Sequence, residues 1–277
     1  MMHIGQYNKL TVLRFTAPGA YLGDDEDNDV LLPTKYLTPD LSIGDEIEVF
    51  LYLDSEDRLV ATTEKPLIEL NSFEFLRVKE VTHFGAFLDW GLEKDLLVPF
   101  KEQSMKLEEG KLYLVYLYLD EATQRLVASA KVKRFFETEH IMVSEKDEVD
   151  VLICDTTDLG KNVVVNDTYS GLIYNNDIFR FLKRGERCKG YVTKVREDGK
   201  LDISLEKPGF LKIEPNSEII LDYLRKNNGS LKLTDKSDPD DIRELLGMSK
   251  KTFKQAIGNL YKQRMVTIHD DHISINE

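Results

Sequence analysis

Three copies of one sequence pattern follow one another along this chain and leave room for a fourth, different segment. Each copy has a glycine, then a long β-rich strand, an acidic turn and a short strand, and the glycines are Gly44, Gly110 and Gly185. A second shared piece lies upstream of each glycine, with the sequences DVLLPTKYL, DLLVPFKEQ and SGLIYNNDIF. Each copy spans about 60 to 75 residues, which is too long for a solenoid repeat and suits a small independent domain.

The long strand of the first copy shows the alternation of a β-strand. In EIEVFLYL one face consists of Ile47, Val49, Leu51 and Leu53, and the other of Glu46, Glu48, Phe50 and Tyr52. Several short strands with turns between them indicate a small sandwich or barrel. Five strands per copy is the count of an OB-type barrel, in which the face of strands 2 and 3 commonly binds oligonucleotides.

Length and composition exclude several classes of protein. A chain of 277 residues is long for a single core, so two to four small domains are expected. No apolar run approaches the roughly 18 residues of a membrane helix, and the N-terminus lacks the layout of a signal peptide. Cys154 and Cys188 are far apart and form no CxxC motif, which argues against a disulfide framework or a cysteine zinc site. These features predict a cytoplasmic protein with no membrane segment.

The formal net charge of −13 is unevenly distributed. Residues 1–66 hold 5 basic and 13 acidic side chains, residues 67–140 hold 10 and 13, residues 141–207 hold 11 and 13, and residues 208–277 hold 11 and 11. The acidity is therefore concentrated in the first copy. A site for polyanions is expected toward the C-terminal half, and the acidic first copy suits protein contacts.

The segment VTHFGAFLDWG, residues 81–91, reads as a strand that Gly85 interrupts, with Phe84 and Phe87 on either side. The two rings could pack in a core or form a surface on which bases stack. With the following DLLVPF, the segment resembles the RNA-binding repeat of ribosomal protein S-one, which has an OB fold. The first and third copies depart from this motif, and at the position after Leu-Val the third copy alone has a ring, Tyr174.

The last 65 residues have helical periodicity. PNSEIILDYLRKNNG places Ile219, Ile220, Tyr223 and Leu224 on one side. Ser237 or Asp238 can cap a second helix that Gly247 ends, and Ser249 can cap a third. MVTIHDDHISI then reads as a hairpin with its turn at Asp270-Asp271. Three helices followed by a hairpin describe a winged helix-turn-helix.

Tandem S-one-like repeats followed by this ending resemble the conserved virulence factor B family over essentially the whole chain. The strongest matching segments are DKSDPDDIRELLGMSKKTFKQAIGNLYKQR and THFGAFLDWGLEKDLLVPF. The resemblance implies a mainly β protein with a C-terminal α+β domain: three five-stranded OB-fold barrels at 1–66, 67–140 and 141–209, and a winged helix at 213–277. It also implies control of gene expression through RNA.

The most basic window of the chain is FRFLKRGERCKGYVTKVR, residues 179–196. Cations that follow a phosphate backbone, together with rings for stacking, are what single-stranded recognition requires. The candidate RNA-binding residues of this region are Tyr174, Arg180, Lys183, Arg184, Arg187, Lys189, Tyr191, Lys194 and Arg196. Phe179 and Phe181 are either further stacking rings or core residues.

Other candidate residues lie outside this window. Phe84 and Phe87 complete the predicted stacking surface, and Lys250, Lys251 and Lys254 lie on the expected recognition helix, with Lys262 and Arg264 beyond it. That helix could contact nucleic acid or protein. The run GDDEDND lacks the spacing of an EF-hand and indicates a solvated acidic loop.

We expect no catalytic residue, metal or cofactor, because the five histidines are scattered and no phosphate-cradling loop or nucleophile elbow is present. The leading hypothesis is a non-enzymatic regulator that binds single-stranded RNA with low sequence specificity. A DNA-binding winged-helix transcription regulator and a protein-interaction scaffold are the alternatives.

Overall fold

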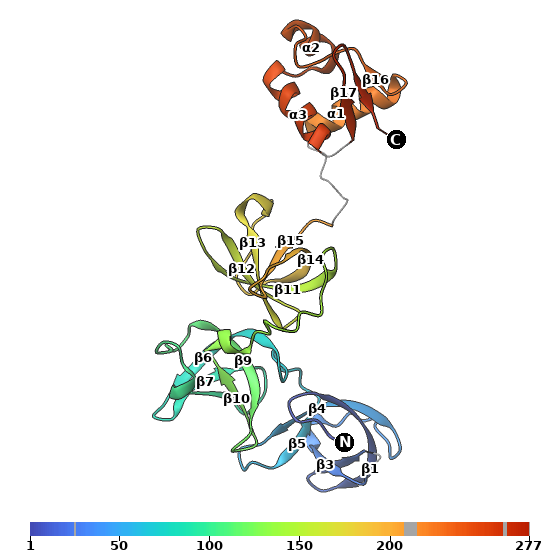
Figure 1. Ribbon diagram of the computed structural model, residues 1–277. Helices are drawn as coiled ribbons and strands as arrows, with labels where there is room; N and C mark the ends of the chain where they lie inside the picture. The colour runs from blue at the N-terminus through green and yellow to red at the C-terminus, as the bar shows by residue number, and fades with distance from the viewer. Residues whose placement is uncertain (25, 208–214, 263–264, 277) are drawn as a thin grey trace. The chain divides into compact units, whose positions relative to one another are not determined.

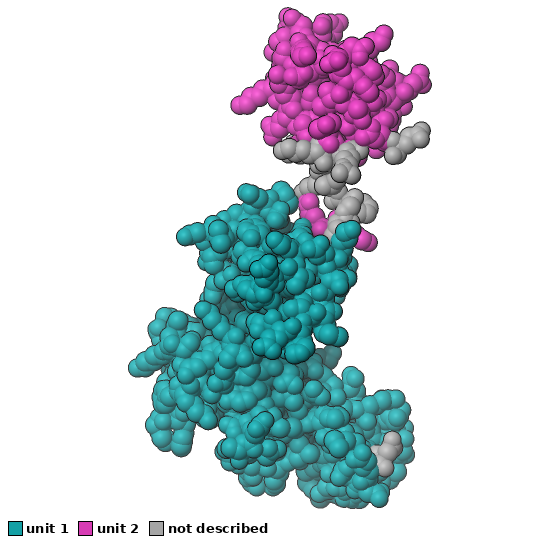
Figure 2. All heavy atoms as spheres, in the orientation of Figure 1, with its two compact units in different colours: residues 1–205 teal, residues 206–277 magenta. Residues whose placement is uncertain are grey.

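The computed structural model describes residues 1–24, 26–207, 215–262 and 265–276. It divides into two compact units, residues 1–205 and residues 206–277, which Figure 2 distinguishes by colour. The first unit contains three five-stranded β-structures, here called barrels 1, 2 and 3, and the second contains three helices and a small sheet (Figure 1). The predicted boundary at residue 209 and the predicted start at residue 213 lie outside the described residues.

Barrels 1 and 3 are closed and share one topology, β1-β2-β3-β5-β4 and β11-β12-β13-β15-β14, with a parallel pairing between their third and fifth strands. The strands of barrel 1 are β1 (Tyr7–Thr16), β2 (Gly19–Gly23), β3 (Asp29–Pro33), β4 (Glu46–Leu53) and β5 (Leu59–Thr62). Those of barrel 3 are β11 (Glu148–Thr156), β12 (Gly160–Val165), β13 (Tyr169–Tyr174), β14 (Arg187–Val195) and β15 (Leu201–Ser204). The predicted five-stranded OB-type barrels are confirmed.

Barrel 2 has the same strand order in a five-stranded sheet, β10-β9-β6-β7-β8. Its strands are β6 (Phe73–Val81), β7 (Gly85–Asp89), β8 (Leu96–Pro99), β9 (Leu112–Asp120) and β10 (Arg125–Ser129). A short 3-10 helix follows the third strand of each barrel, at Thr34–Tyr36 (η1), Phe100–Glu102 (η2) and Asn175–Asp177 (η4), and a further one, η3 (Val132–Phe135), follows β10. The segment 81–91 is therefore not one interrupted strand, because β6 ends at Val81 and β7 begins at Gly85.

One glycine opens the second strand of every barrel, and it is required by close backbone packing. A Cβ on Gly19, Gly85 or Gly160 would lie 2.0, 2.3 or 1.9 Å from the carbonyl oxygen of Leu32, Val98 or Ile173 on the neighbouring third strand. The φ angles of the three glycines are 153°, 152° and 158°, which L side chains rarely adopt. Gly85 thus permits the close approach of β7 to β8.

Neighbouring barrels share apolar contacts within the first unit. Phe50 and Tyr52 lie on the outward face of β4, as the alternation predicts, but both are buried against barrel 2, where each ring packs edge-on to Trp90. A second apolar cluster joins barrels 2 and 3. Its buried members are Phe73, Phe75, Leu152, Cys154 and Val164.

The second unit has the predicted order of three helices and a hairpin. Its elements are α1 (Pro215–Lys226), β16 (Ser230–Leu231), α2 (Pro239–Leu246), α3 (Lys250–Lys262), β17 (Val266–Ile268) and β18 (Ile273–Ile275). The Asp238 carboxylate accepts from the N–H of Asp240 at 2.9 Å, which confirms the cap of α2, and Gly247 ends that helix at φ 67°.

One face of α1 differs from the prediction. Ile220 and Leu224 are buried as expected, whereas Ile219 is 45% exposed and Leu221 takes its place in the core. The sequence does not distinguish these neighbours, because apolar residues at 219, 220 and 221 fit two adjacent helical stripes.

Candidate nucleic-acid interface

The two predicted stacking rings of barrel 2, Phe84 and Phe87, lie at the face formed by its second and third strands, β7 and β8. Phe87 is half-buried on β7 and lies directly opposite Leu97 of β8. Phe84 is 63% exposed in the turn that precedes β7, and its N–H donates to the Thr82 hydroxyl at 3.2 Å. Neither ring belongs to the barrel core, so both are available to a ligand on the face where OB folds commonly bind oligonucleotides.

An apolar pocket of about 280 Å³ lies beside these rings. Its wall includes side chains from both barrel 1 and barrel 2. The lining residues are Tyr52, Leu53, Phe84, Phe87, Trp90, Lys94, Asp95, Leu96, Leu97, Arg125, Leu126 and Val127. The contribution of Tyr52 and Leu53 was not predicted. The sequence did carry a signal, because Phe50 and Tyr52 share a face of the strand with Glu46 and Glu48, and two aromatic residues there indicate that another part of the protein packs on this face.

The basic window of barrel 3 is largely neutralised by its own Glu186 and by carboxylates from outside the window. The pairs are Arg180 with Glu186 (2.6 Å), Arg184 with Asp155 (3.0 Å), Arg187 with Glu74 (3.0 Å) and Asp167 (3.2 Å), Lys189 with Asp150 (2.8 Å), and Arg196 with Asp202. The Tyr191 hydroxyl donates to Glu148 at 2.8 Å. Within the part of the chain that the structure describes, Lys183 and Lys194 are exposed and have no ion pair.

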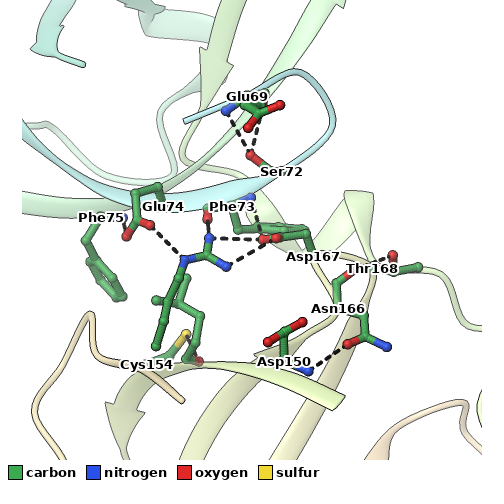
Figure 3. Close-up of polar contacts among 12 residues, drawn as sticks. Glu69, Ser72, Phe73, Glu74, Phe75, Asp150, Cys154, Asn166, Asp167 and Thr168 are labelled. Atoms are coloured by element: carbon green, nitrogen blue, oxygen red, sulfur yellow. Dashed lines mark hydrogen bonds and ion pairs between the residues drawn. The ribbon is translucent and has the colours of Figure 1, made fainter. Parts of the chain in front are cut away.

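Arg187 is a structural residue between barrels 2 and 3. Its guanidinium donates to both carboxylate oxygens of Asp167 at 3.2 Å, to Glu74 at 3.0 Å and to the carbonyl oxygen of Phe73 at 2.5 Å. Figure 3 labels the three residues that supply these acceptors, Glu74, Phe73 and Asp167. We therefore assign Arg187 to the contact between the barrels and leave it out of the candidate interface.

The loop between β13 and β14 presents aromatic rings to solvent. Phe179 is 61% exposed and Phe181 is 86% exposed, so neither is a core residue. Phe181 lies four residues before Gly185, and the residues four before Gly110 and Gly44 are Lys106 and Asp40. The exposed ring at this position is thus specific to barrel 3.

A cleft of about 750 Å³ lies along β12 and β13 and reaches the segment that joins barrels 2 and 3. Arg196 lines this cleft, and its guanidinium donates to Asp202 at 2.7 Å and to the Tyr174 hydroxyl at 3.1 Å. Lys133, Asn162 and Lys200 also line it and were not predicted. The sequence did not indicate Lys133, because this residue lies outside the basic window. The folded chain places it beside barrel 3.

The winged helix offers fewer free cations than its sequence suggests. Lys250 donates to the carbonyl oxygen of Ser237 at 2.7 Å, and Lys254 lies 3.6 Å from Asp235. Lys251 is exposed and has no ion pair among the described residues. The Lys262 side chain and Arg264 lie outside what the structure describes. The turn between β17 and β18 falls at Asp270-Asp271, as predicted, so the tip of the wing is acidic.

The described residues give no sign of a metal centre or a membrane span. No group of three or more histidine, cysteine, aspartate or glutamate side chains among them is placed to hold a metal ion. No helix within the described ranges is long and apolar enough to cross a membrane.

Three OB-type barrels followed by a winged helix define a multidomain protein built from two folds that commonly bind nucleic acids. Comparison with protein families agrees with this class. The S1 domain family matches residues 4–64 and 72–131, which contain barrels 1 and 2, and the CvfB-like winged helix domain matches residues 218–275. Both are families of binding domains rather than of enzymes.

Relatives cover nearly the whole chain. Uncharacterized protein YitL of Bacillus subtilis is 32% identical over 96% of this chain and 91% of its own length. Conserved virulence factor B of Staphylococcus epidermidis is 28% identical over 86% of this chain and 82% of its own. A solved structure from Streptococcus pneumoniae, described as a multidomain protein with nucleic acid binding domains, is 23% identical over 99% of this chain and 98% of its own, with a TM-score of 0.40. The chain belongs to the conserved virulence factor B family.

Proposed function

We propose that this protein is a non-enzymatic RNA-binding protein that binds single-stranded RNA with low sequence specificity. The observation that carries the proposal is the pair of accessible rings, Phe84 and Phe87, at the β7–β8 face of barrel 2. An exposed phenylalanine gains from stacking on a base, and stacking tolerates any sequence because every base has a π-face. A duplex keeps its bases stacked internally, so single strands are the favoured ligand.

Barrel 3 contributes further rings and cations in this proposal. Phe181 and Tyr174 are exposed, and Lys183 and Lys194 supply positive charge, while Arg196 remains paired with Asp202. Asp202 is mostly buried beside Arg196, whereas the ion pairs of Arg180, Arg184 and Lys189 join more exposed groups, and such exposed pairs contribute about 0–1 kcal/mol. A polyphosphate can therefore compete for these cations, although fewer of them are free than the seven that the sequence suggests.

The winged helix is proposed to add phosphate contacts through Lys251. Its acidic wing tip, Asp270 and Asp271, disfavours the approach of that hairpin to duplex DNA. We further propose a cytoplasmic role in regulating gene expression through RNA, in keeping with relatives named for virulence. Residues 1–66, which include barrel 1, hold 5 basic and 13 acidic side chains. We propose that the outer surface of barrel 1 binds protein partners.

Fluorescence anisotropy with a labelled single-stranded RNA of about 12 nucleotides, compared with duplex DNA over a salt series, tests the proposal. The double substitution Phe84→Ala/Phe87→Ala should weaken RNA binding by about tenfold or more, because each stacked base contributes about 1–3 kcal/mol. Phe15→Ala is the matched control, since Phe15 is an exposed phenylalanine (44%) of barrel 1 that does not line the pocket.

A charge variant provides a second test. Lys183→Glu/Lys194→Glu should weaken RNA binding. It should also reduce the slope of log affinity against log salt concentration by about 0.7 for each phosphate contact that is lost. Unchanged RNA affinity in the double phenylalanine variant would contradict the proposal. Tighter binding to duplex DNA would instead support a winged-helix transcription regulator, and no binding to either nucleic acid would support a protein scaffold.

A further inference from the structure

The turn between β4 and β5 of barrel 1 reaches the rim of the pocket in barrel 2. The Asp57 carboxylate forms an ion pair with Arg125 and lies 3.5 Å from the Lys94 amino group. Lys94 also donates to the carbonyl oxygen of Asp54 at 2.6 Å. Both cations that line the pocket are therefore held by a single acidic turn of the neighbouring barrel.

The Asp57 carboxylate is not needed to form its own turn. That task belongs to Asp54, whose carboxylate accepts from the N–H groups of Glu56 and Arg58 at 2.9 and 3.0 Å. The corresponding turn of barrel 2 is closed in the same way by Asp120, which accepts from Ala122 at 3.0 Å. The Asp57 carboxylate instead contacts Lys94 and Arg125, in the neighbouring barrel.

The pocket offers an apolar wall for a nucleotide base and cations for a nucleotide phosphate. Its wall is formed largely by aromatic and aliphatic side chains, among them Phe84, Phe87 and Tyr52, and it is about 280 Å³ in volume. Such a wall suits a flat base, because bases stack on aromatic side chains. Arg125 and Lys94 line the same pocket, and a guanidinium can bind a phosphate through two parallel hydrogen bonds.

We propose that this pocket receives one unstacked base of single-stranded RNA, and that Asp57 occupies the position of an RNA phosphate on Arg125 and Lys94 in the free protein. This inference rests on the function proposed above. Binding then exchanges one anion for another: the phosphate replaces the Asp57 carboxylate, while the base enters the pocket. The Asp57 side chain is 39% exposed, so the released carboxylate can be solvated.

This exchange makes binding selective for single strands. A phosphate alone gains little, because it must first displace a carboxylate of similar charge. A single strand gains in addition from the base in the pocket, whereas a duplex has no free base to offer. The N-terminal barrel, despite its acidity, is thus a part of the RNA site: it supplies Tyr52 and Leu53 to the wall and Asp57 to the rim.

The test compares Asp57→Asn with Asp29→Asn in the full chain. Asp29 is a close match, since it forms an ion pair with Arg14 in barrel 1 and is 38% exposed. Asp57→Asn should tighten the binding of a labelled single-stranded RNA by about two- to fivefold, the range expected from loss of the exposed ion pairs of Asp57 with Arg125 and Lys94. It should tighten duplex binding by a larger factor, so that the preference for single strands falls. Asp29→Asn should change both affinities by less than twofold.

Arg125→Gln completes a double-mutant cycle. It should weaken RNA binding, lower the slope of log affinity against log salt concentration by about 0.7, and reduce the effect of Asp57→Asn in the double variant to the part that Lys94 contributes. Thermal unfolding of each variant shows whether the contact between barrels 1 and 2 persists. Equal effects of Asp57→Asn and Asp29→Asn, or a loss of affinity on Asp57→Asn in a folded protein, would overturn this inference alone. Absence of RNA binding by the unmodified chain would overturn the proposed function as well.

Discussion

The guanidinium of Arg187 in barrel 3 lies 3.0 Å from the carboxylate of Glu74 in barrel 2. The same guanidinium holds both oxygens of Asp167 and the carbonyl oxygen of Phe73, while Asp167 accepts in turn from the N–H of Phe73 at 3.1 Å. Beside this network the ring of Phe73 stacks on that of Phe136 at 4.8 Å. One arginine therefore satisfies polar groups of two barrels at the edge of an apolar contact.

Replacing Arg187 by methionine should destabilise the first unit by about 1–3 kcal/mol, because Glu74, Asp167 and the Phe73 carbonyl lose their shared donor. Urea denaturation of the full chain measures the change. Lys189→Met is the control on the same strand, where the pair with Asp150 is exposed and loss of about 0.5 kcal/mol or less is expected. Equal losses in the two variants would show that Arg187 does not join the barrels.

Gly85→Ala should destabilise the protein by about 1–3 kcal/mol, since the new Cβ meets the carbonyl oxygen of Val98 and the residue keeps an unfavourable φ. Gly44→Ala separates the two causes, because Gly44 has a positive φ but nothing within 4 Å of the added Cβ. Thermal unfolding should show a larger loss for Gly85→Ala than for Gly44→Ala. The reverse order would mean that the backbone approach of β7 to β8 is not the constraint.

Phe181→Ser should weaken binding to single-stranded RNA by about fivefold or more, the effect of losing one stacked base, and should leave the free energy of unfolding nearly unchanged. Met142→Ser is the matched control, because Met142 is an equally exposed apolar residue of the same part of the chain, at 87% against 86% for Phe181. Anisotropy titrations measure both variants. If both lose affinity equally, or neither does, Phe181 is not a stacking residue.

Much of the fold was predictable from local pattern. The alternation in EIEVFLYL and the threefold repetition predict five-stranded barrels, because the side-chain period of a strand is visible in any sequence. The caps at Asp238 and Gly247 predict the limits of α2 for a similar reason, since capping depends on neighbouring residues. Ile219 was misplaced because three consecutive apolar residues fit more than one helical stripe.

The sequence predicts three OB-type barrels and a winged helix, and it places Phe84 and Phe87 close together near one turn. Which charges are free depends on the folded structure. Arg184 and Arg187 are paired with Asp155, Glu74 and Asp167, carboxylates that are distant along the chain and adjacent in space. Local sequence determines strands and turns, whereas ion pairing depends on distance in three dimensions, and so a basic window in the sequence became a largely neutral surface in the folded protein.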